Sequence, residues 1–208
     1  LALAHDGALY LGLRGRVIRV DLSAPQPVVR DVVTGLPTTG RHPLLALAMA
    51  LDGFLYINIG SATDHCETAD GKAPDPQRAC PETSQSLPQA SIIRVRPGVK
   101  PILWKDAELV ATGVRNSMAL AVLPDGALVA AVNARDAINQ TDPALSDAAL
   151  PHDTFNVIRK GANYGWPYCF DDHRPSPEYP HYSCANMEKP ILLLPAHAAP
   201  LGLLFYQG

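Results

Sequence analysis

Short apolar stretches separated by turn-forming residues recur along this chain, and their polar positions keep a fixed order. The dipeptide Asp-Gly stands between two such stretches three times, at Asp6-Gly7, Asp52-Gly53 and Asp125-Gly126. A further apolar stretch containing Ile-Arg follows each copy, at Ile18-Arg19, Ile93-Arg94 and Ile158-Arg159. Because Asp and Gly both tolerate the positive φ of a tight turn, each Asp-Gly predicts an antiparallel hairpin. No stretch has sustained helical periodicity.

The recurrence predicts an all-β protein, a β-propeller built from four-stranded antiparallel blades. In each unit, strand A precedes Asp-Gly, strand B follows it, strand C carries Ile-Arg and strand D follows a proline, as in 101–110. We expect one partial propeller domain over 1–208, with a clipped first blade at 1–33, blades at 44–110 and 117–194, and the start of another at 201–208. A ring needs at least four complete blades, so further blades or a second chain are expected to complete it.

Composition narrows the class of protein. The 208 residues are 47% hydrophobic and 18% charged, with a formal net charge of −3, which disfavours nucleic-acid and membrane-surface partners. No apolar run reaches the roughly 18 residues of a membrane span. The chain opens inside a strand-like stretch without Met or a signal-peptide layout, so we expect a piece of a longer protein.

The four cysteines form two local pairs, Cys66 with Cys80 and Cys169 with Cys184. None stands in a Cys-x-x-Cys arrangement, which disfavours a zinc ribbon or haem attachment. Two local disulfides are favoured over free thiols. Disulfides indicate an oxidising compartment, so we expect a periplasmic or secreted protein.

Chemistry-bearing residues share one phase of the repeat. The D–A loops and the two long B–C connections, 61–90 and 133–153, lie on the same face of an antiparallel blade. Successive D–A loops carry His42, the pair Arg115-Asn116, and His197. His42 is a candidate general base. Arg115 is suited to hold a carboxylate-bearing cofactor, the alternative being an ion pair with a loop acid; for Asn116 and His197 the alternative is a purely local role in shaping the loop.

The stretch from Asn133 to Asp136 leads into a loop rich in Asp. Its free carbonyl and carboxylate oxygens are the ligands that Ca²⁺ prefers, although a solvated acidic loop is the default interpretation. The sequence has no Gly-rich phosphate loop, Gly-x-Ser-x-Gly elbow or His-Glu-x-x-His motif. Nucleotide-driven, serine-hydrolase and thermolysin-like zinc chemistry therefore lack their residues.

Several longer motifs resemble the soluble quinoprotein dehydrogenases of the glucose/sorbosone dehydrogenase family, the sorbosone-dehydrogenase-like branch above all. The motifs are DGFLYINIGS from Asp52, TGVRNSMALAVLPDG from Thr112, VNARD from Val132, FNVIRKGANYGWPYC from Phe155 and PAHAAPLGLLFY from Pro195. The resemblance covers most of the chain. It implies a six-bladed propeller that uses pyrroloquinoline quinone (PQQ) and Ca²⁺ to oxidise an aldose or a similar sugar aldehyde or hemiacetal, passing electrons to an external acceptor.

The resemblance also implies roles for individual residues. His42 matches the base that takes the sugar hydroxyl proton, and Arg115 and Asn116 match the pair that contacts the quinone, with His197 a further candidate for the cofactor site. The carbonyl groups of Ala134 and Arg135 match those that bind Ca²⁺. Ser61 departs from the family pattern, because aldose dehydrogenases often carry an Asp there that orients the base.

Two alternatives belong to other functional classes. A catalytically silent propeller would bind a glycan or a protein partner through the same face. A Ca²⁺-dependent lactonase on a similar propeller would need several carboxylates around the axis, and the D–A loops offer none.

Overall fold

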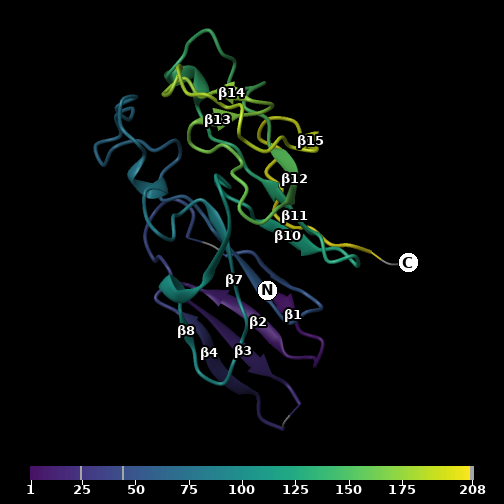
Figure 1. The fold of residues 1–208 in the computed structure, drawn as a ribbon. Coiled ribbons are helices and arrows are strands. Elements are labelled where there is room, and N and C mark those ends of the chain that lie inside the picture. Colours follow the sequence, from purple (N-terminus) through teal and green to yellow (C-terminus); the bar gives the residue numbers. More distant parts are fainter. Residues whose placement is uncertain (24, 44, 207–208) are drawn as a thin grey trace.

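The computed structural model of the chain describes residues 1–23, 25–43 and 45–206 and confirms the all-β propeller class (Figure 1). Leu44, the expected first residue of the second blade, and residues 207–208 lie outside the described residues. Helical structure in the described part is confined to three short 3₁₀ turns: η1 (Pro81–Thr83), η2 (Trp104–Asp106) and η3 (Ile138–Gln140). None of the helices there is long and apolar enough to cross a membrane.

Three meandering antiparallel sheets form the body of the molecule. The first contains β1 (Ala2–Leu3), β2 (Leu9–Leu13), β3 (Arg16–Asp21) and β4 (Val28–Thr34). The second contains β5 (Leu47–Met49), β6 (Leu55–Ile59), β7 (Ser91–Val95) and β9 (Glu108–Thr112). The third contains β10 (Ala119–Val122), β11 (Leu128–Val132), β12 (Thr154–Ile158) and β15 (Leu192–Leu193). Each sheet has the strand order of a propeller blade.

The expected single strand D over 101–110 is wrong in detail. The structure divides it into β8 (Ile102–Leu103) and β9, with η2 between them. β8 leaves the second sheet and pairs in parallel with β4, as the fifth strand of the first sheet. A short hairpin of β13 (Cys169–Phe170) and β14 (Arg174–Pro175) completes the strands.

The Asp-Gly hairpins form, but with a different turn from the expected one. In each of them only the glycine adopts positive φ, at 82°, 84° and 88° for Gly7, Gly53 and Gly126. The Asp side chain instead accepts the N–H two residues further on, at 3.0 to 3.1 Å. The backbone hydrogen bonds enclose a three-residue loop, so Asp acts through its carboxylate and Gly through its backbone freedom.

Neighbouring sheets pack face to face through their apolar positions. One core joins the first and second sheets and includes Val17, Val33, Leu55 and Ile57, each fully buried. A second core joins the second and third sheets around Ile92 and other small or branched side chains. The sheets therefore stack side by side, and the long connections that follow β6, β11 and β12 lie towards the top of the view (Figure 1).

The segment 201–206, expected to begin another blade, forms no strand in the described residues. Its apolar side chains are largely exposed, with Leu204 at 83% and Tyr206 at 79% of full exposure. A strand is defined by hydrogen bonds to a partner, and the described part of the chain supplies no partner for this segment.

Candidate active site

A cavity of about 250 Å³ opens where loops leave the second and third sheets. It is lined by His42, Arg115, Asn116, Asn133, Ala134, Asp136, Asp153, His197 and Ala199. The structure thus brings together five of the six residues singled out from the sequence. They come from the loop before β5, the loop after β9, the loop after β11 and the segment after β15.

His42 is held beside Ser61, at the end of β6, as a single tautomer. Its Nδ1 lies 2.9 Å from the Ser61 hydroxyl oxygen and 3.1 Å from the Ser61 carbonyl oxygen. The same hydroxyl donates its proton to the Thr63 carbonyl at 2.6 Å, so it accepts from His42. Nδ1 therefore carries the proton, and Nε2 keeps the lone pair that a base needs.

The surroundings of His42 also favour its neutral form. Burial, followed by the positive charge of Arg115, lowers the pKa of His42 to about 4. Gly60 makes the close packing possible, because a Cβ at that position would lie 2.6 Å from both the Cβ and the carbonyl oxygen of His42. The imidazole is thus available as an uncharged base throughout the neutral range.

Arg115 is buried and makes four hydrogen bonds to protein groups. Its Nε donates to the Asp64 carbonyl at 3.0 Å, and its Nη2 forms a buried ion pair with the Asp64 carboxylate. Its Nη1 donates to the carbonyl oxygens of Asn133 at 3.0 Å and Ala134 at 2.6 Å. The alternative of an ion pair with a loop acid is therefore what the structure shows for this side chain.

The Gly-Ala-Asn-Tyr-Gly-Trp-Pro stretch docks beside the Arg115 loop. Thr112 and Gly113 exchange backbone hydrogen bonds with residues 162–166. Gly113 has a φ of 70°, and a Cβ there would lie 2.2 Å from Asn163 Oδ1, so this contact requires glycine. The docking brings Trp166 Nε1 within 2.9 Å of the Asp64 carbonyl oxygen.

His197 also lines the cavity, and its backbone is in the left-handed region with φ 56°. Its Nε2 donates to the Asp147 carbonyl at 2.8 Å, and its Nδ1 lies 3.5 Å from Asp136 Oδ1. The hydrogen bond to Asp147 and the nearby carboxylates raise the pKa of His197. The imidazole thus serves at least to join the 133–153 loop to the 195–200 segment.

Arg135, whose carbonyl was expected to bind Ca²⁺ together with that of Ala134, does not line this cavity. Its side chain runs into the interior, where Nη1 pairs with the buried carboxylate of Glu178. Ala134 does line the cavity, and its N–H donates to Asp153 Oδ1 at 2.7 Å. Asp153 also accepts the Ala199 N–H at 2.7 Å, which ties the two loops together.

Oxygen atoms around the cavity form a donor set suited to a hard cation. Among the described residues, the buried amide oxygens of Asn116 and Asn133 have no hydrogen-bond partner. Asp136, Asp153 and Ala134 line the same space, and the Ala134 carbonyl oxygen also accepts Arg115 Nη1. Uncompensated oxygen atoms beside carboxylates are what Ca²⁺ coordinates, so these residues fit the ion.

One edge of the cavity, at the Arg115 guanidinium, is suited to an anionic group such as a quinone carboxylate. Arg115 is the one Arg or Lys side chain that lines it in the described part of the chain, and most of its N–H groups are already bonded. A guanidinium has five N–H donors, so about one remains, on the side where Asp136 Oδ2 lies 3.7 Å from Nη2. A quinone would therefore contact this chain at Asn116, at the one remaining Arg115 N–H and at a cation held by the oxygen atoms around the cavity.

Both expected disulfides form, Cys66–Cys80 and Cys169–Cys184. They pack with Trp166, Tyr168 and Tyr179 in a third buried cluster. Tyr168 accepts the Cys80 N–H at 2.8 Å, so the 61–90 loop is fastened to the segment that follows β12. This cluster supports the loop that carries Asp64.

Sequence reasoning passed over Asp64 and did not select Asp136 or Asp153 as site residues. The signal for Asp64 was weak, because a lone acid in a long loop is usually solvated, yet its side chain is only 3% exposed. Burial raises the pKa of Asp64, but the hydrogen bond from His65 and the charge of Arg115 outweigh it and hold the pKa below the ordinary value.

The fold and this cavity define a β-propeller protein with a cleft that is lined by ionisable side chains and lies where loops leave the second and third sheets. Residues 12–208 match the family model described as Glucose / Sorbosone dehydrogenase, and the chain belongs to that family. A curated relative, an uncharacterised protein of Borreliella burgdorferi, is 32% identical over 108 residues, which are 50% of this chain and 26% of that protein.

Solved structures share the fold at low sequence identity. A Trichoderma reesei protein of carbohydrate-active enzyme family AA12 matches 97% of this chain and 56% of its own, with a TM-score of 0.75 and 20% identity. The holo PQQ domain of Coprinopsis cinerea pyranose dehydrogenase covers 99% and 56%, with a TM-score of 0.71 and 15% identity. The PQQ-bound aldose sugar dehydrogenase of Streptomyces coelicolor covers 93% and 55%, with a TM-score of 0.54 and 17% identity. The chain thus spans little more than half the length of these proteins.

Proposed function

We propose that the protein is a PQQ- and Ca²⁺-dependent sugar dehydrogenase that oxidises an aldose or a sugar aldehyde or hemiacetal, with His42 as the base. The observation that carries the proposal is the state of His42: Nδ1 is protonated and bonded to Ser61, and Nε2 is unprotonated beside a cation-type oxygen set. Family membership and the two PQQ-containing structural relatives support the choice of cofactor.

When bound, PQQ together with Ca²⁺ would supply the acceptor for the hydride of the substrate C–H bond. The residues of this chain supply the rest. His42 Nε2 takes the proton of the sugar hydroxyl, and the Ser61 hydroxyl and carbonyl keep the imidazole in the basic tautomer. Asn116, Asn133 and Ala134 present oxygen ligands to the cation.

The positions of the remaining groups follow from the same arrangement. Arg115 has about one N–H left for the cofactor, and His197 lines the same cavity. Further cofactor contacts would come from additional blades or a second chain that completes the propeller. The two disulfides favour a periplasmic or secreted location. The electron acceptor in this proposal is external to the chain.

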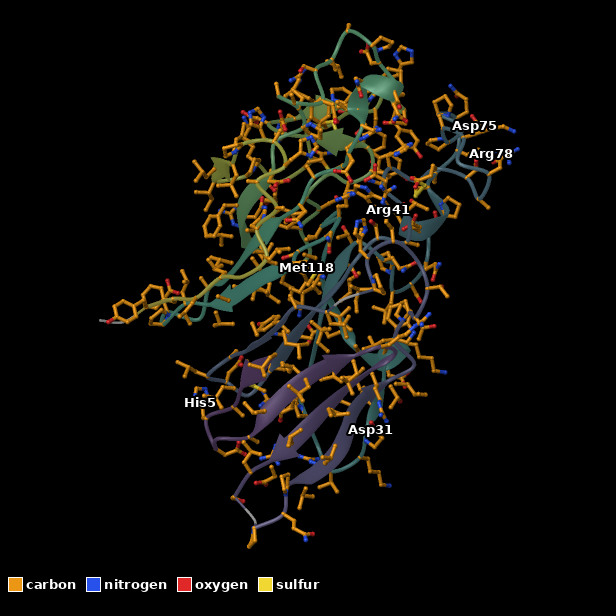
Figure 2. All side chains as sticks on the ribbon, turned by 180° about the vertical axis from the view of Figure 1, so that it is seen from behind. His5, Asp31, Arg41, Asp75, Arg78 and Met118 are labelled. Atoms are coloured by element: carbon orange, nitrogen blue, oxygen red, sulfur yellow. A yellow bond between two sulfur atoms is a disulfide. The ribbon has the colours of Figure 1, made fainter. Side chains whose placement is uncertain are left out.

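The test is sugar oxidation by the protein supplied with PQQ and Ca²⁺ and coupled to a dye acceptor. We expect sugar-dependent dye reduction, and H42A should lower turnover by about 10²–10⁴-fold, the usual contribution of a general base. H5A is the matched control, because His5 lies on a turn between β1 and β2, far from Arg41, the residue that precedes His42 (Figure 2). PQQ titration that detects no binding, with glycan or protein binding retained, would identify the silent propeller instead.

A further inference from the structure

Asp64 receives hydrogen bonds from three segments that are distant in the sequence. Its carbonyl oxygen accepts Arg115 Nε at 3.0 Å and Trp166 Nε1 at 2.9 Å. Its carboxylate pairs with Arg115 Nη2, and each of its oxygens accepts the Asp136 N–H at 3.2 Å. Asp64 therefore joins the 61–90 loop, the loop after β9, the loop after β11 and the segment after β12.

Arg115 carries this connection onward to the cleft. While Nε and Nη2 are held by Asp64, Nη1 donates to the carbonyl oxygens of Asn133 and Ala134, which belong to residues that line the cleft. Because the guanidinium is planar and rigid, fixing its Nε and Nη2 groups also fixes the direction of its Nη1 group. Both charged side chains are about 5% exposed or less, so neither partner exchanges freely with water.

We propose that Asp64 is a positioning residue of the cleft: it fixes Arg115 as a cross-link whose Nη1 holds the backbone carbonyl groups of Asn133 and Ala134, and so orients the stretch that presents the Asn133 amide oxygen to the cation site. Arg115 accordingly acts mainly on the protein's own carbonyl groups, and only secondarily on a bound anion. The inference rests on the proposed function for the identity of the cation, and on the hydrogen-bond geometry alone for the cross-link.

The first test is a calcium titration of the full chain by calorimetry, without quinone. D64N and R115K should each weaken Ca²⁺ binding by about 10–100-fold, the usual effect of losing a group that orients metal ligands. In R115K the positive charge stays but the fork that reaches two carbonyl groups is lost. Because both substitutions break one connection, their effects should not add in the double variant.

The matched control is D75N. Asp75 belongs to the same 61–90 loop and pairs with Arg78, but both side chains are exposed at the outer tip of the loop, away from Arg41 (Figure 2). D75N removes the same charge as D64N and should leave Ca²⁺ binding unchanged. R115K binding Ca²⁺ as tightly as the wild type would overturn the proposal, because charge alone would then account for D64N.

The second test does not depend on any ligand. The Asp136 N–H is bonded to the Asp64 carboxylate, so amide hydrogen exchange in a peptide spanning 133–137 should accelerate in D64N and stay at the wild-type rate in D75N. If D64N does not fold, R115K is measured instead: it removes the Nη1 bonds to the Asn133 and Ala134 carbonyl groups, so the same peptide should again exchange faster than in the wild type. If the wild-type chain binds no Ca²⁺ and D64N still exchanges faster than the wild type, the proposed function is contradicted and the cross-link is supported. If exchange in the variant is unchanged, the cross-link is rejected.

Discussion

Replacing Ser61 with Asp tests the assignment of His42 most sharply. In the wild-type chain the His42 Nδ1–H is accepted by a neutral hydroxyl and a carbonyl, and the pKa is lowered to about 4. A carboxylate at the same position would stabilise the imidazolium. An opposite charge within about 4–6 Å raises a pKa by roughly 1–3 units, so S61D should bring His42 to about 5–7.

The change has a calculable effect on the fraction of active base. At pH 5 about nine tenths of the wild-type imidazole is neutral, given a pKa of about 4. With a shift of about 2 units that fraction falls to about one tenth, so sugar oxidation at pH 5 should drop about tenfold, while at pH 8 it should be nearly unchanged. The sign follows from the role, because only the unprotonated form accepts the substrate proton.

Two measurements check this prediction. NMR titration of the His42 ring reports its pKa directly, and the pH profile of dye-linked sugar oxidation reports the acid limb. S61A serves as the control, since the Ser61 carbonyl still accepts the Nδ1–H and the acid limb should stay in place. Circular dichroism verifies that each variant is folded, because Ser61 is buried. A folded S61D whose His42 pKa rises while the acid limb of the activity stays fixed would refute His42 as the base.

Three further predictions concern stability. The folded-state pKa of His42, about 4, is below its unfolded value, so its stabilising contribution is present above about pH 6.5 and is lost as pH falls towards 4; urea unfolding across this range should show the loss, and H42Q should flatten it. The paired substitution C66S/C80S opens a loop with a sequence separation of 14 and should lower the free energy of unfolding by about 2–4 kcal/mol, measured in urea, whereas an unchanged midpoint would show that the aromatic cluster alone holds the loop. G113A should destabilise by at least about 1 kcal/mol in thermal unfolding because of its positive φ and the contact with Asn163, while G98A, where a Cβ meets open space, should be nearly neutral.

The repeating part of this protein can be predicted from its amino-acid sequence alone. Asp-Gly and Ile-Arg recur at strand boundaries, so the hairpins and the four-strand units could be predicted, and local cysteine spacing was enough to predict both disulfides. The gathering of His42, Arg115 and His197 at one cavity was also predictable, since equivalent loops of neighbouring sheets leave on the same side. These features depend on neighbours along the chain or on the repeat.

The partners of the buried polar groups, in contrast, depend on how the sheets and loops pack together. Arg115 pairs with Asp64, 51 positions away, and the Arg135 side chain turns inward to Glu178, 43 positions away. β8 likewise leaves its own sheet to pair with β4. An arginine has several equivalent donors and a long flexible stem, so its own sequence context does not select among distant acceptors. The selection is made when packing of the sheets removes water and leaves one arrangement in which the buried charges and carbonyl groups are paired.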